Sequence, residues 1–262
     1  MLPEKRRDYI IEKLKIEKSV LVKDLSKELK VTQETIRRDL QILEEQGKLI
    51  KTHGGAFIRD GVNNDIDVRI RETIYIDAKE KIGLACSELI HDGETIILDV
   101  STTSIQIARH IKDKRVTVLT NSLRVTEELC NCESIKLVSL GGTLDHHSLS
   151  FLGFDTINTL KQYYVDKAFV SCRGIDMDTG VTDSNEFQAQ VRQTMLNQGK
   201  TNYLIIDKTK LDVIAFSKIS EVTRFDTVVI EDLPDAWAEY FRLKGVNVLI
   251  AAPAAQLPDN QI

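Results

Sequence analysis

The chain has 262 residues, of which 42% are hydrophobic and 29% charged, and its formal net charge at pH 7 is −5. This composition is typical of a soluble globular protein and excludes a fibrous or largely disordered chain. No apolar run approaches the roughly 18–20 residues that cross a bilayer, and residues 1–15 mix charged with apolar residues, which argues against a signal peptide. We therefore expect a cytoplasmic protein with no membrane partner.

The charge is unevenly distributed. Residues 1–59 hold 14 Lys and Arg against 10 Asp and Glu, a balance of +4. The chain totals are 35 and 40, which leaves 21 and 30 for residues 60–262, a balance of −9. A basic end on an acidic body suggests that only the first part meets nucleic acid, although the excess is modest and a weak argument alone.

The cysteines and histidines do not indicate a metal site or a cofactor. Cys130 and Cys132 are one residue apart, too close for a CxxC motif, and Cys86 and Cys172 are isolated. We expect four reduced thiols packed as small apolar groups. The pair His146-His147 has no accompanying carboxylate–histidine motif and is interpreted as a solvated loop.

The amino-terminal region predicts three helices. Residues 3–17 and 22–29 carry apolar side chains at helical spacing. A third helix is expected to begin at Thr32, which can cap the free amides, with Val31 and Ile36 as a hydrophobic staple. Gly47 is well placed to end it.

Two short extended pieces follow, at 48–52 and 56–58. His53, Gly54 and Gly55 lie between them, and we expect the glycines to adopt the positive φ angles of a tight hairpin. Helix, short helix, turn, helix and hairpin together predict a winged helix-turn-helix domain over residues 1–59. The polar, turn-rich segment "GVNNDID" begins a predicted linker over residues 60–75.

From residue 76 to residue 252 the pattern alternates between helices and short apolar strands. Strands are expected at 95–98, 116–119, 135–140, 167–171, 203–206, 227–230 and 246–250. Helices are expected at 77–90, 104–111, 123–130, 186–198 and 235–244. Alternating βαβ units predict an α/β domain with a mainly parallel sheet covered on both faces, followed by a flexible tail at 253–262.

The third helix carries the candidate DNA contacts. Its apolar side is Ile36, Leu40 and Leu43, which leaves Arg37 and Arg38 outside. Arginine can grip guanine bidentately or bind phosphate, and Gln and Thr can read adenine or the thymine methyl group. The alternative is an ordinary solvated face, since adjacent arginines are common on helices. The predicted DNA-binding residues are Thr32, Gln33, Thr35, Arg37, Arg38, Lys51, His53 and Gly54.

The same helix carries four carboxylates, at Glu34, Asp39, Glu44 and Glu45. We therefore expect the affinity for phosphates to come from few charges and to fall steeply with salt.

Polar residues in the body follow the predicted strands. They occur in "ILDVSTTS", "TNS", "LGGT", "SCRGIDMDTGVTDSNE" and "IIDKTK". Capping and ordinary turns could explain each stretch singly, but all fall at the carboxyl ends of parallel strands, where open α/β sheets bind ligands. Amides, cations and carboxylates together suit a sugar phosphate. The predicted ligand-binding residues are Asp99, Ser101, Thr102, Thr103, Asn121, Gly141, Gly142, Arg173, Asp176, Glu186, Lys208 and Lys210.

The stretch "ETIRRDLQILEEQGKLIKTHGGA" resembles the amino-terminal signature of the DeoR family of bacterial transcriptional regulators. The resemblance continues to about residue 250 through the Asp99 strand end, "TNSL", "LGGT" with "SLSFLG", "GID" and "DKTK". It implies DNA contacts at Thr35, Arg37, Arg38 and the wing. It also implies a body with a fold that resembles ribose-phosphate isomerases and CoA-transferases and that senses phosphorylated sugars.

One departure concerns the phosphate loop. The family pattern Asp-Ser-Gly-Thr-Thr is here Asp99-Val100-Ser101-Thr102-Thr103, so that a serine replaces a glycine. The geometry of phosphate binding is therefore open, although the serine could supply an extra donor.

The expected function is that of a DNA-binding repressor of a carbohydrate-utilisation operon, controlled by a phosphorylated sugar. Its partners would be double-stranded operator DNA, the sugar phosphate and further copies of the chain, as a dimer or tetramer. The alternative is a sugar-phosphate isomerase-like enzyme with an accessory DNA-binding domain, in which Asp99, Asp176, Glu186 and Lys208 would move protons. A third possibility is a DNA binder without sequence preference. No catalytic residue is assigned.

Overall fold

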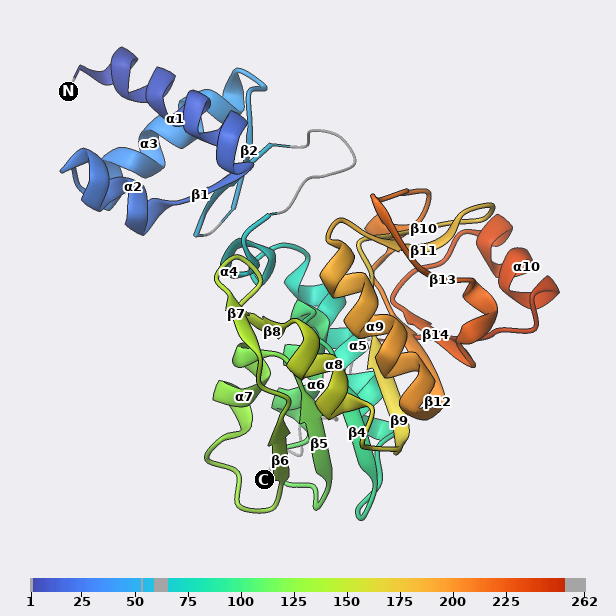
Figure 1. Ribbon diagram of the computed structural model, residues 1–262. Helices are drawn as coiled ribbons and strands as arrows, with labels where there is room; N and C mark the ends of the chain where they lie inside the picture. The colour runs from blue at the N-terminus through green and yellow to red at the C-terminus, as the bar shows by residue number, and fades with distance from the viewer. Residues whose placement is uncertain (1, 53, 59–65, 253–262) are drawn as a thin grey trace, which may run out of the picture. The chain divides into compact units, whose positions relative to one another are not determined.

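The computed structural model describes residues 2–52, 54–58 and 66–252. The chain divides into two compact units, Met1–Ile76 and Asp77–Ile262 (Figure 1). The wing residue His53, residues 59–65 of the predicted linker and the predicted tail lie outside the described residues.

The first unit is built around three helices with one apolar core. They are α1 (Pro3–Glu17), α2 (Val22–Leu29) and α3 (Gln33–Glu45), as the spacing predicts. Their core consists of side chains from all three helices and from the strands between and after them: Ile10, Leu14, Val20, Val22, Leu25, Ile36, Leu40, Leu43, Leu49 and Ala56.

Both predicted ends of α3 are confirmed. The Thr32 hydroxyl accepts a hydrogen bond from the amide of Thr35 at 3.2 Å, which satisfies one of the free amides at the helix start. At the other end Gly47 has φ +69°, its amide donates to Glu44 O, and the amide of Lys48 donates to Leu43 O. These two bonds form a Schellman motif, which requires a left-handed residue where Gly47 stands.

The wing is a three-stranded antiparallel sheet in the order β1-β3-β2. The strands are β1 (Ser19–Leu21), β2 (Ile50–Lys51) and β3 (Gly55–Phe57). The sequence predicted the last two but not β1, which has only three residues between two helices. The expectation of positive φ at Gly54 and Gly55 is wrong. Gly55 is needed for another reason, because a Cβ there would lie 2.0 Å from Val20 O on the neighbouring strand.

The predicted linker at 60–75 requires a correction in its second half. Helix α4 (Val68–Arg71) lies there, capped by the Asp67 side chain, and Ile66 and Ile70 pack against Phe57 of the wing. The amide of Asp67 also donates to Ser19 Oγ at 3.0 Å. Residues 66–76 therefore belong to the first unit, because their apolar side chains find a surface that only the folded wing provides.

The second unit is centred on a seven-stranded parallel sheet. Its order is β15-β14-β12-β9-β4-β5-β6, so the predicted parallel sheet is confirmed. The strands are β4 (Thr95–Leu98), β5 (Thr117–Thr120), β6 (Lys136–Ser139), β9 (Val165–Val170), β12 (Gly199–Ile205), β14 (Thr227–Ile230) and β15 (Asn247–Ile250).

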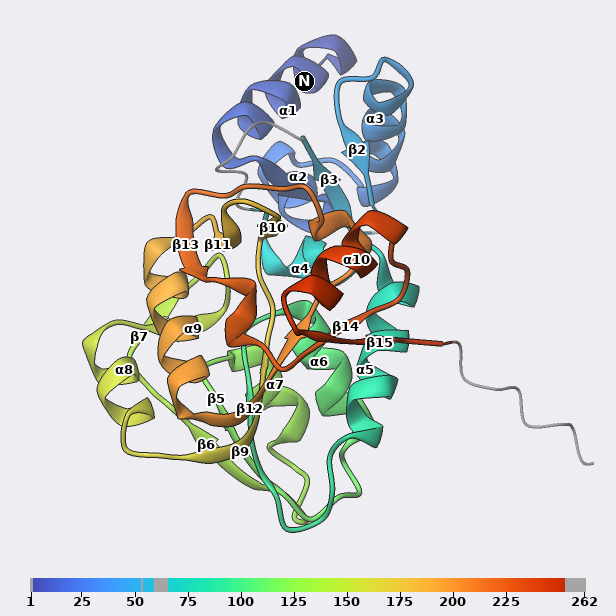
Figure 2. The ribbon, with the colours of Figure 1, turned by 90° about the vertical axis from the view of Figure 1, so that its right-hand side faces the viewer.

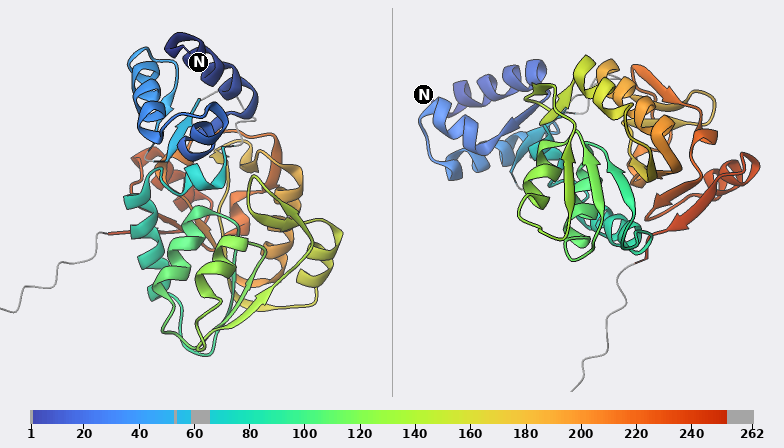
Figure 3. Two further views of the ribbon diagram at one scale, coloured as in Figure 1. Left: turned by 90° about the vertical axis from the view of Figure 1, so that its left-hand side faces the viewer. Right: turned by 60° about the horizontal axis from the view of Figure 1, so that its bottom comes forward.

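Helices cover both faces of the sheet (Figure 3). On one face Ile96, Leu98 and Val118 pack against α5 (Ile76–Glu88), α6 (Thr102–His110) and α7 (Leu123–Leu129). On the other face Ile97, Leu119 and Ala168 pack against α8 (Phe154–Leu160), α9 (Glu186–Gln198) and α10 (Asp235–Leu243). Neighbouring residues of β4 point to opposite faces, and both are buried, as a parallel sheet with two covered faces requires.

Several short elements were not predicted. The hairpin of β7 (Thr143–Asp145) and β8 (Ser150–Leu152) precedes α8. A three-stranded sheet contains β10 (Gly174–Asp176), β11 (Gly180–Asp183) and β13 (Ser217–Ser220), and short 3-10 helices lie at Lys208–Lys210 and Val222–Arg224. Strand β15 and helix α10 lie at one edge of the body (Figure 2).

Candidate functional sites

Helix α3 presents a polar face with two arginines. Gln33, Arg37 and Arg38 are exposed, and Thr35 is half-buried with its hydroxyl 2.9 Å from that of Thr32. Arg37 donates to Gln33 Oε1 at 3.3 Å and lies 3.6 Å from Glu34. No hydrogen bond or ion pair joins Arg38 to another described residue, so its guanidinium is available to an anion.

One carboxylate of α3 faces inward. Asp39 is 3% exposed, accepts a hydrogen bond from Arg6 Nε, and lies 3.8 Å from Arg7. Of the four carboxylates on this helix, Asp39 is therefore paired inside the domain, where it joins α1 to α3.

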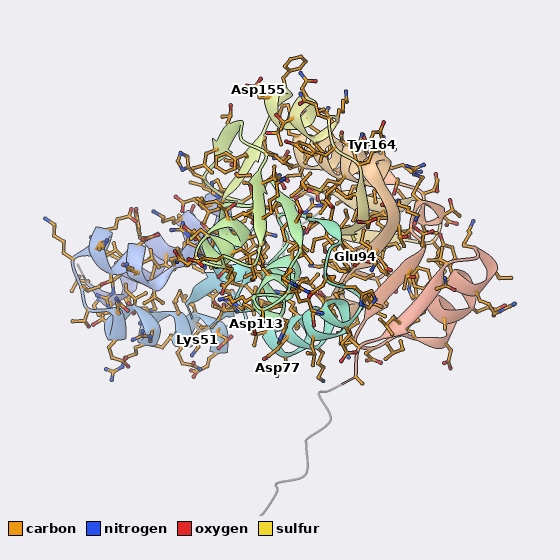
Figure 4. The ribbon with its side chains drawn as sticks, turned by 90° about the horizontal axis from the view of Figure 1, so that it is seen from below. Lys51, Asp77, Glu94, Asp113, Asp155 and Tyr164 are labelled. Carbon is orange, nitrogen blue, oxygen red and sulfur yellow. The ribbon has the colours of Figure 1, made fainter. Side chains whose placement is uncertain are left out.

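The wing is fastened to α3 by two side chains. Glu44 accepts a hydrogen bond from the amide of Lys51 at 2.8 Å, and the Lys51 ammonium contacts Gln41 Oε1. Lys51, labelled in Figure 4, is thus half-buried against the helix that precedes it. The Gly54 carbonyl accepts a hydrogen bond from the amide of Val22 at 3.0 Å.

In the second unit, the sheet order creates a switch point between β4 and β9. From β4 the chain proceeds to β5 and β6 on one side, and from β9 to β12, β14 and β15 on the other. Ligands of open parallel sheets bind at the carboxyl ends of such a pair. Figure 4 views the opposite edge, where Glu94 precedes β4 and pairs with Lys167.

Asp99 lies at this switch point but has no lone pair to spare for a ligand. One of its oxygens accepts from the Ser101 amide at 2.9 Å and the Ser104 hydroxyl at 2.7 Å. The other accepts from the Ser171 amide at 3.0 Å and Arg192 Nε at 2.9 Å. Asp99 is fully buried and ties together α6, β9 and α9.

Arg192 forms a buried ion triad with Asp99 and Asp183. It is 5% exposed and pairs with a carboxylate on each side. Burial alone would raise the pKa of the Asp99 carboxyl, but the Arg192 charge and the hydrogen bonds from Ser101 and Ser104 outweigh it and hold that pKa below its usual value. Burial would lower the pKa of Arg192, and the two carboxylates raise it instead.

The amino end of α6 is arranged for an anion. Ser101 caps the helix by accepting from the Ser104 amide at 3.1 Å, and it donates its own proton to Ser104 Oγ. The serine that replaces the family glycine is therefore a cap rather than a spare donor. In the described chain, the amides and hydroxyls of Thr102 and Thr103 have no hydrogen-bond partner, and both side chains are buried. Such amides suit a phosphate.

A polar belt extends from β5 to α9. Asn121, 1% exposed, donates from Nδ2 to Phe151 O at 3.1 Å. Ser122 caps α7 and faces Ser150 of β8 across an antiparallel bridge. Gln188 of α9 donates to Ser150 Oγ at 2.7 Å, so the belt links β5, β8 and α9.

A second charged group follows β12. Asp207 is 2% exposed, and although burial would raise its pKa, Lys210, Thr209 and Lys79 hold it below the usual value. Burial raises the pKa of the Cys172 thiol to about 12, although the nearby charge of Lys210 lowers it in part. A thiol with that pKa stays protonated and unreactive near neutral pH.

The two glycines of "LGGT" differ in their surroundings, because a Cβ at Gly141 would meet nothing within 4 Å, whereas one at Gly142 would clash. Gly142 has φ +115°, and a Cβ there would lie 2.2 Å from Thr156 Oγ1 and 2.7 Å from Leu152 O. The Thr156 hydroxyl donates to Gly141 O at 2.6 Å. Their close contacts are therefore with β8 and α8.

Four further predicted ligand residues follow strands of the body or begin α9: Asp176, Lys208, Glu186 and Arg173. Asp176 accepts from the amides of Asp178 and Thr179 in the β10–β11 turn, which lowers its pKa. Lys208 pairs with Asp232 at 2.8 Å, beyond β14. Glu186 is exposed in the first turn of α9. Arg173 is half-buried after β9, where its amide donates to Thr182 O.

Sequence reasoning missed the residues that organise the switch point from α9 and β8. Arg192 contacts a carboxylate 93 positions away, and Gln188 contacts serines about 40 positions away. In sequence both look like ordinary polar positions of an amphipathic helix. Their only signal is a spacing of four residues, which puts them on one helix face.

Three further findings concern the described part of the chain. It contains no cluster of three His, Cys, Asp or Glu side chains that could hold a metal ion. None of its helices is long and apolar enough to cross a membrane. All four cysteines are free, but the expectation that all of them pack as apolar groups is wrong for Cys130, which is exposed; Cys132 is half-buried, and Cys86 and Cys172 are buried.

Comparison with known proteins identifies both units. Residues 6–61 match the DeoR-like helix-turn-helix domain, and residues 75–232 match the DeoR C terminal sensor domain. The chain is 32% identical over 249 residues to the putative aga operon transcriptional repressor of Escherichia coli O157:H7, covering 94% of this chain and 93% of that protein. It is 32% identical over 238 residues to the lactose phosphotransferase system repressor of Lactococcus lactis, covering 88% and 92%.

Among solved structures, ribose 5-phosphate isomerase A from Methanocaldococcus jannaschii is similar to 52% of this chain and 54% of that one. The identity is 19% and the TM-score 0.39. A likeness of this extent identifies neither an activity nor a ligand.

Proposed function

This chain belongs to the DeoR family of transcriptional regulators, and on that premise we propose that it represses a carbohydrate-utilisation operon under the control of a phosphorylated sugar. The sugar phosphate would bind at the carboxyl edge of the parallel sheet and change the affinity of the winged helix for operator DNA. One observation carries the proposal. The same chain contains a helix with exposed arginines, α3, and a sensor domain in which the start of α6 has free amides and hydroxyls that can bind an anion.

The DNA-binding half of the proposal is supported by the face of α3. Arg37 is held by Gln33 and Glu34 on its own helix, and Arg38 is exposed. Arginines presented in this way can bind guanine or phosphate in the major groove. Thr32, Thr35, Lys51, His53 and Gly54 complete the proposed DNA contacts. A repressor that acts on operator DNA would work in the cytoplasm.

The effector half is supported by the start of α6. Two free amides and two buried hydroxyls, from Thr102 and Thr103, offer donors to a phosphate. Two relatives described above are named as a putative repressor of the aga operon and as the repressor of a lactose phosphotransferase system. These names support repression and a link to sugar metabolism.

The isomerase alternative has weaker support from the geometry. Enediol chemistry needs a base and an electrophilic partner within reach of one substrate. Asp99 has four hydrogen-bond donors on its two oxygens, Asp176 closes a turn, and Lys208 pairs with Asp232. We therefore propose that the body binds a sugar phosphate without converting it.

A single winged helix makes few contacts with DNA, so we also propose that the chain acts as a homo-oligomer on repeated half-sites. Two copies of a helix-turn-helix domain can bind two half-sites that are about one turn of the DNA helix apart.

The two halves can be tested separately in one pair of proteins. The double variant Arg37→Ala with Arg38→Ala should lose specific retardation of DNA from its own upstream region, by at least about tenfold per arginine lost. It should keep the wild-type thermal shift with sugar phosphates. A matched control, Arg115→Ala with Arg242→Ala, removes two exposed arginines of the body and should retain DNA binding. Equal DNA binding by both variants would contradict the assignment of α3.

A further inference from the structure

Two buried acceptors in the polar belt have no donor. Five buried side-chain oxygens have no hydrogen-bond partner among the described residues, and two of them, Asn121 Oδ1 and Gln188 Oε1, belong to the polar belt. Asn121 is 1% exposed and Gln188 5% exposed. A buried polar atom without a partner is costly, so each calls for an explanation.

The orientation of the Gln188 amide follows from the protons around it. The Ser148 hydroxyl donates to the Asp145 carboxylate, which at neutral pH can only accept. Ser148 and Ser150 are 2.7 Å apart, and since the Ser148 proton is already used, Ser150 must donate to Ser148. Neither hydroxyl then has a proton left for Gln188.

Both serine oxygens must therefore accept from Gln188. Its Nε2 donates toward Ser148 Oγ at 3.0 Å and Ser150 Oγ at 2.7 Å, two oxygens that lie close together on one side of the amide nitrogen. Turning the amide over would place Oε1 against two oxygens that have no hydrogen to give. The series of hydrogen bonds from Asp145 through Ser148 and Ser150 therefore fixes the orientation of the Gln188 amide. Its Oε1 faces away from the two serines and remains an acceptor.

Asn121 is fixed by a similar argument. Its Nδ2 donates to the carbonyl of Phe151, the residue after Ser150 on β8. A carbonyl can only accept, so Nδ2 must stay there and Oδ1 must point elsewhere.

The fold places both acceptors beside the switch point. Asn121 follows β5, whose neighbour β4 ends at Asp99. Gln188 is one turn before Arg192 on α9, and Arg192 contacts Asp99. The amino end of α6 begins two residues after Asp99, at Ser101 and Thr102.

From this arrangement we propose that Gln188 and Asn121 read the hydroxyl groups of the effector. This inference rests on the proposed function, and it adds the specificity: the effector is a polyhydroxylated monophosphate that donates two hydroxyl hydrogens to these carbonyls. A carboxylate or second phosphate placed against these two carbonyl oxygens would find no donor in them, because an amide oxygen can only accept.

The test compares Gln188→Met with wild type in the full-length protein. Met keeps the length of the side chain and removes both the acceptor and the amide hydrogens. Isothermal titration would use ribose 5-phosphate, glucose 6-phosphate, fructose 1-phosphate and fructose 6-phosphate as probes, with inorganic phosphate as a probe of the α6 end alone. The matched control is Gln190→Met, an exposed glutamine on the same helix.

For the sugar phosphate that wild type binds, Gln188→Met should weaken affinity about tenfold or more, because a buried ligand hydroxyl is left unpaired. Affinity for inorganic phosphate should stay unchanged, and Gln190→Met should match wild type with every probe. Ser150→Ala removes one of the two acceptors that orient the Gln188 amide and should also weaken sugar phosphate binding. This variant tests the inference if Gln188→Met does not fold.

Two outcomes would overturn the inference in distinguishable ways. If wild type binds a sugar phosphate and the folded Gln188→Met and Ser150→Ala variants bind it equally well, the reading of hydroxyls is wrong and the proposed function stands. An equal loss for inorganic phosphate would likewise show a general collapse of the site. If wild type binds none of the four sugar phosphates, the proposed function fails and this inference fails with it.

Discussion

At the scale of single residues, the chain buries several charges and uses each to fasten one element to another. Asp39 with Arg6 joins α3 to α1, and Asp99 with Arg192 joins α6 to α9. Burying an ion pair is costly in itself, so such pairs contribute less to stability than to a defined arrangement. In the body that arrangement includes the helix end proposed to bind the effector.

Removing Arg192 should therefore be severe. Arg192→Met leaves Asp99 and Asp183 buried without their cation, and loss of one partner of a buried pair costs about 3–5 kcal/mol. We expect a clear fall in the denaturation midpoint of the body, measured by urea titration. The control Arg242→Met removes an exposed arginine paired with Glu239, and should change stability by less than about 0.5 kcal/mol. Similar effects from both substitutions would show that the triad is not buried in this way.

The lowered pKa of Asp99 predicts a pH dependence. Its pKa in the folded state lies below the ordinary 3.8, so the carboxylate stabilises the fold above the unfolded pKa. That stabilisation is lost as the pH falls through the folded value. Asp99→Asn should therefore be much less stable than wild type at pH 7, and the difference should shrink below about pH 4. Urea titrations at several pH values measure this, with exposed Asp113→Asn as the control. A difference independent of pH would exclude an ionised Asp99.

At the scale of elements, the close approach of β1 and β3 in the wing requires a glycine at position 55 but not at position 54. At Gly55 a Cβ would lie 2.0 Å from Val20 O, whereas at Gly54 nothing lies within 4 Å. Gly55→Ala should force β1 and β3 apart, with a loss of roughly 1–3 kcal/mol and weaker DNA binding. Gly54→Ala should be nearly neutral for the stability of the domain, because a Cβ there meets nothing within 4 Å. Thermal unfolding and DNA retardation of the two variants measure the contrast, and equal behaviour would contradict the close approach of the strands.

Helices and strands with a clear apolar pattern, or with a typical capping residue at their ends, could be predicted from the sequence. The predicted bounds match those of two helices, 3–17 and 22–29, and of two strands, 95–98 and 227–230. Thr32 caps the start of α3 and Gly47 terminates it, as expected. Strands β1, β7 and β10 could not be predicted, because three residues are too few for alternation and their pairing partners lie elsewhere in the chain. Helix α4 was hidden for the same reason, since its apolar side chains need the folded wing.

The candidate sites divide along similar lines. Residues that directly follow strands, such as Asp99 and Asn121, could be placed at the edge of the sheet, because parallel strands share that edge. Their roles could not be predicted, because the partners of Asp99 come from three separate elements. Arg192 and Gln188 were missed because position within a helix does not distinguish a buried polar residue from a solvated one.

At the scale of the whole molecule, the two units perform different tasks in one chain. The first carries the basic excess and the exposed arginines, and the second carries the acidic balance and the anion-ready helix end. An effector can control DNA binding only if it binds the two functional states with different affinity. Coupling between two such sites is typically about 5–150-fold in affinity and acts in both directions.

The most direct test is a titration of the full-length protein into fluorescent DNA from its own upstream region, at low ionic strength, with and without each sugar phosphate. We expect tight, sequence-dependent binding, and a change in Kd of at least about fivefold with one of the sugar phosphates. The same protein should show no such change with inorganic phosphate at equal ionic strength. Failure to bind this DNA, or a Kd that no phosphorylated sugar alters, would contradict the account.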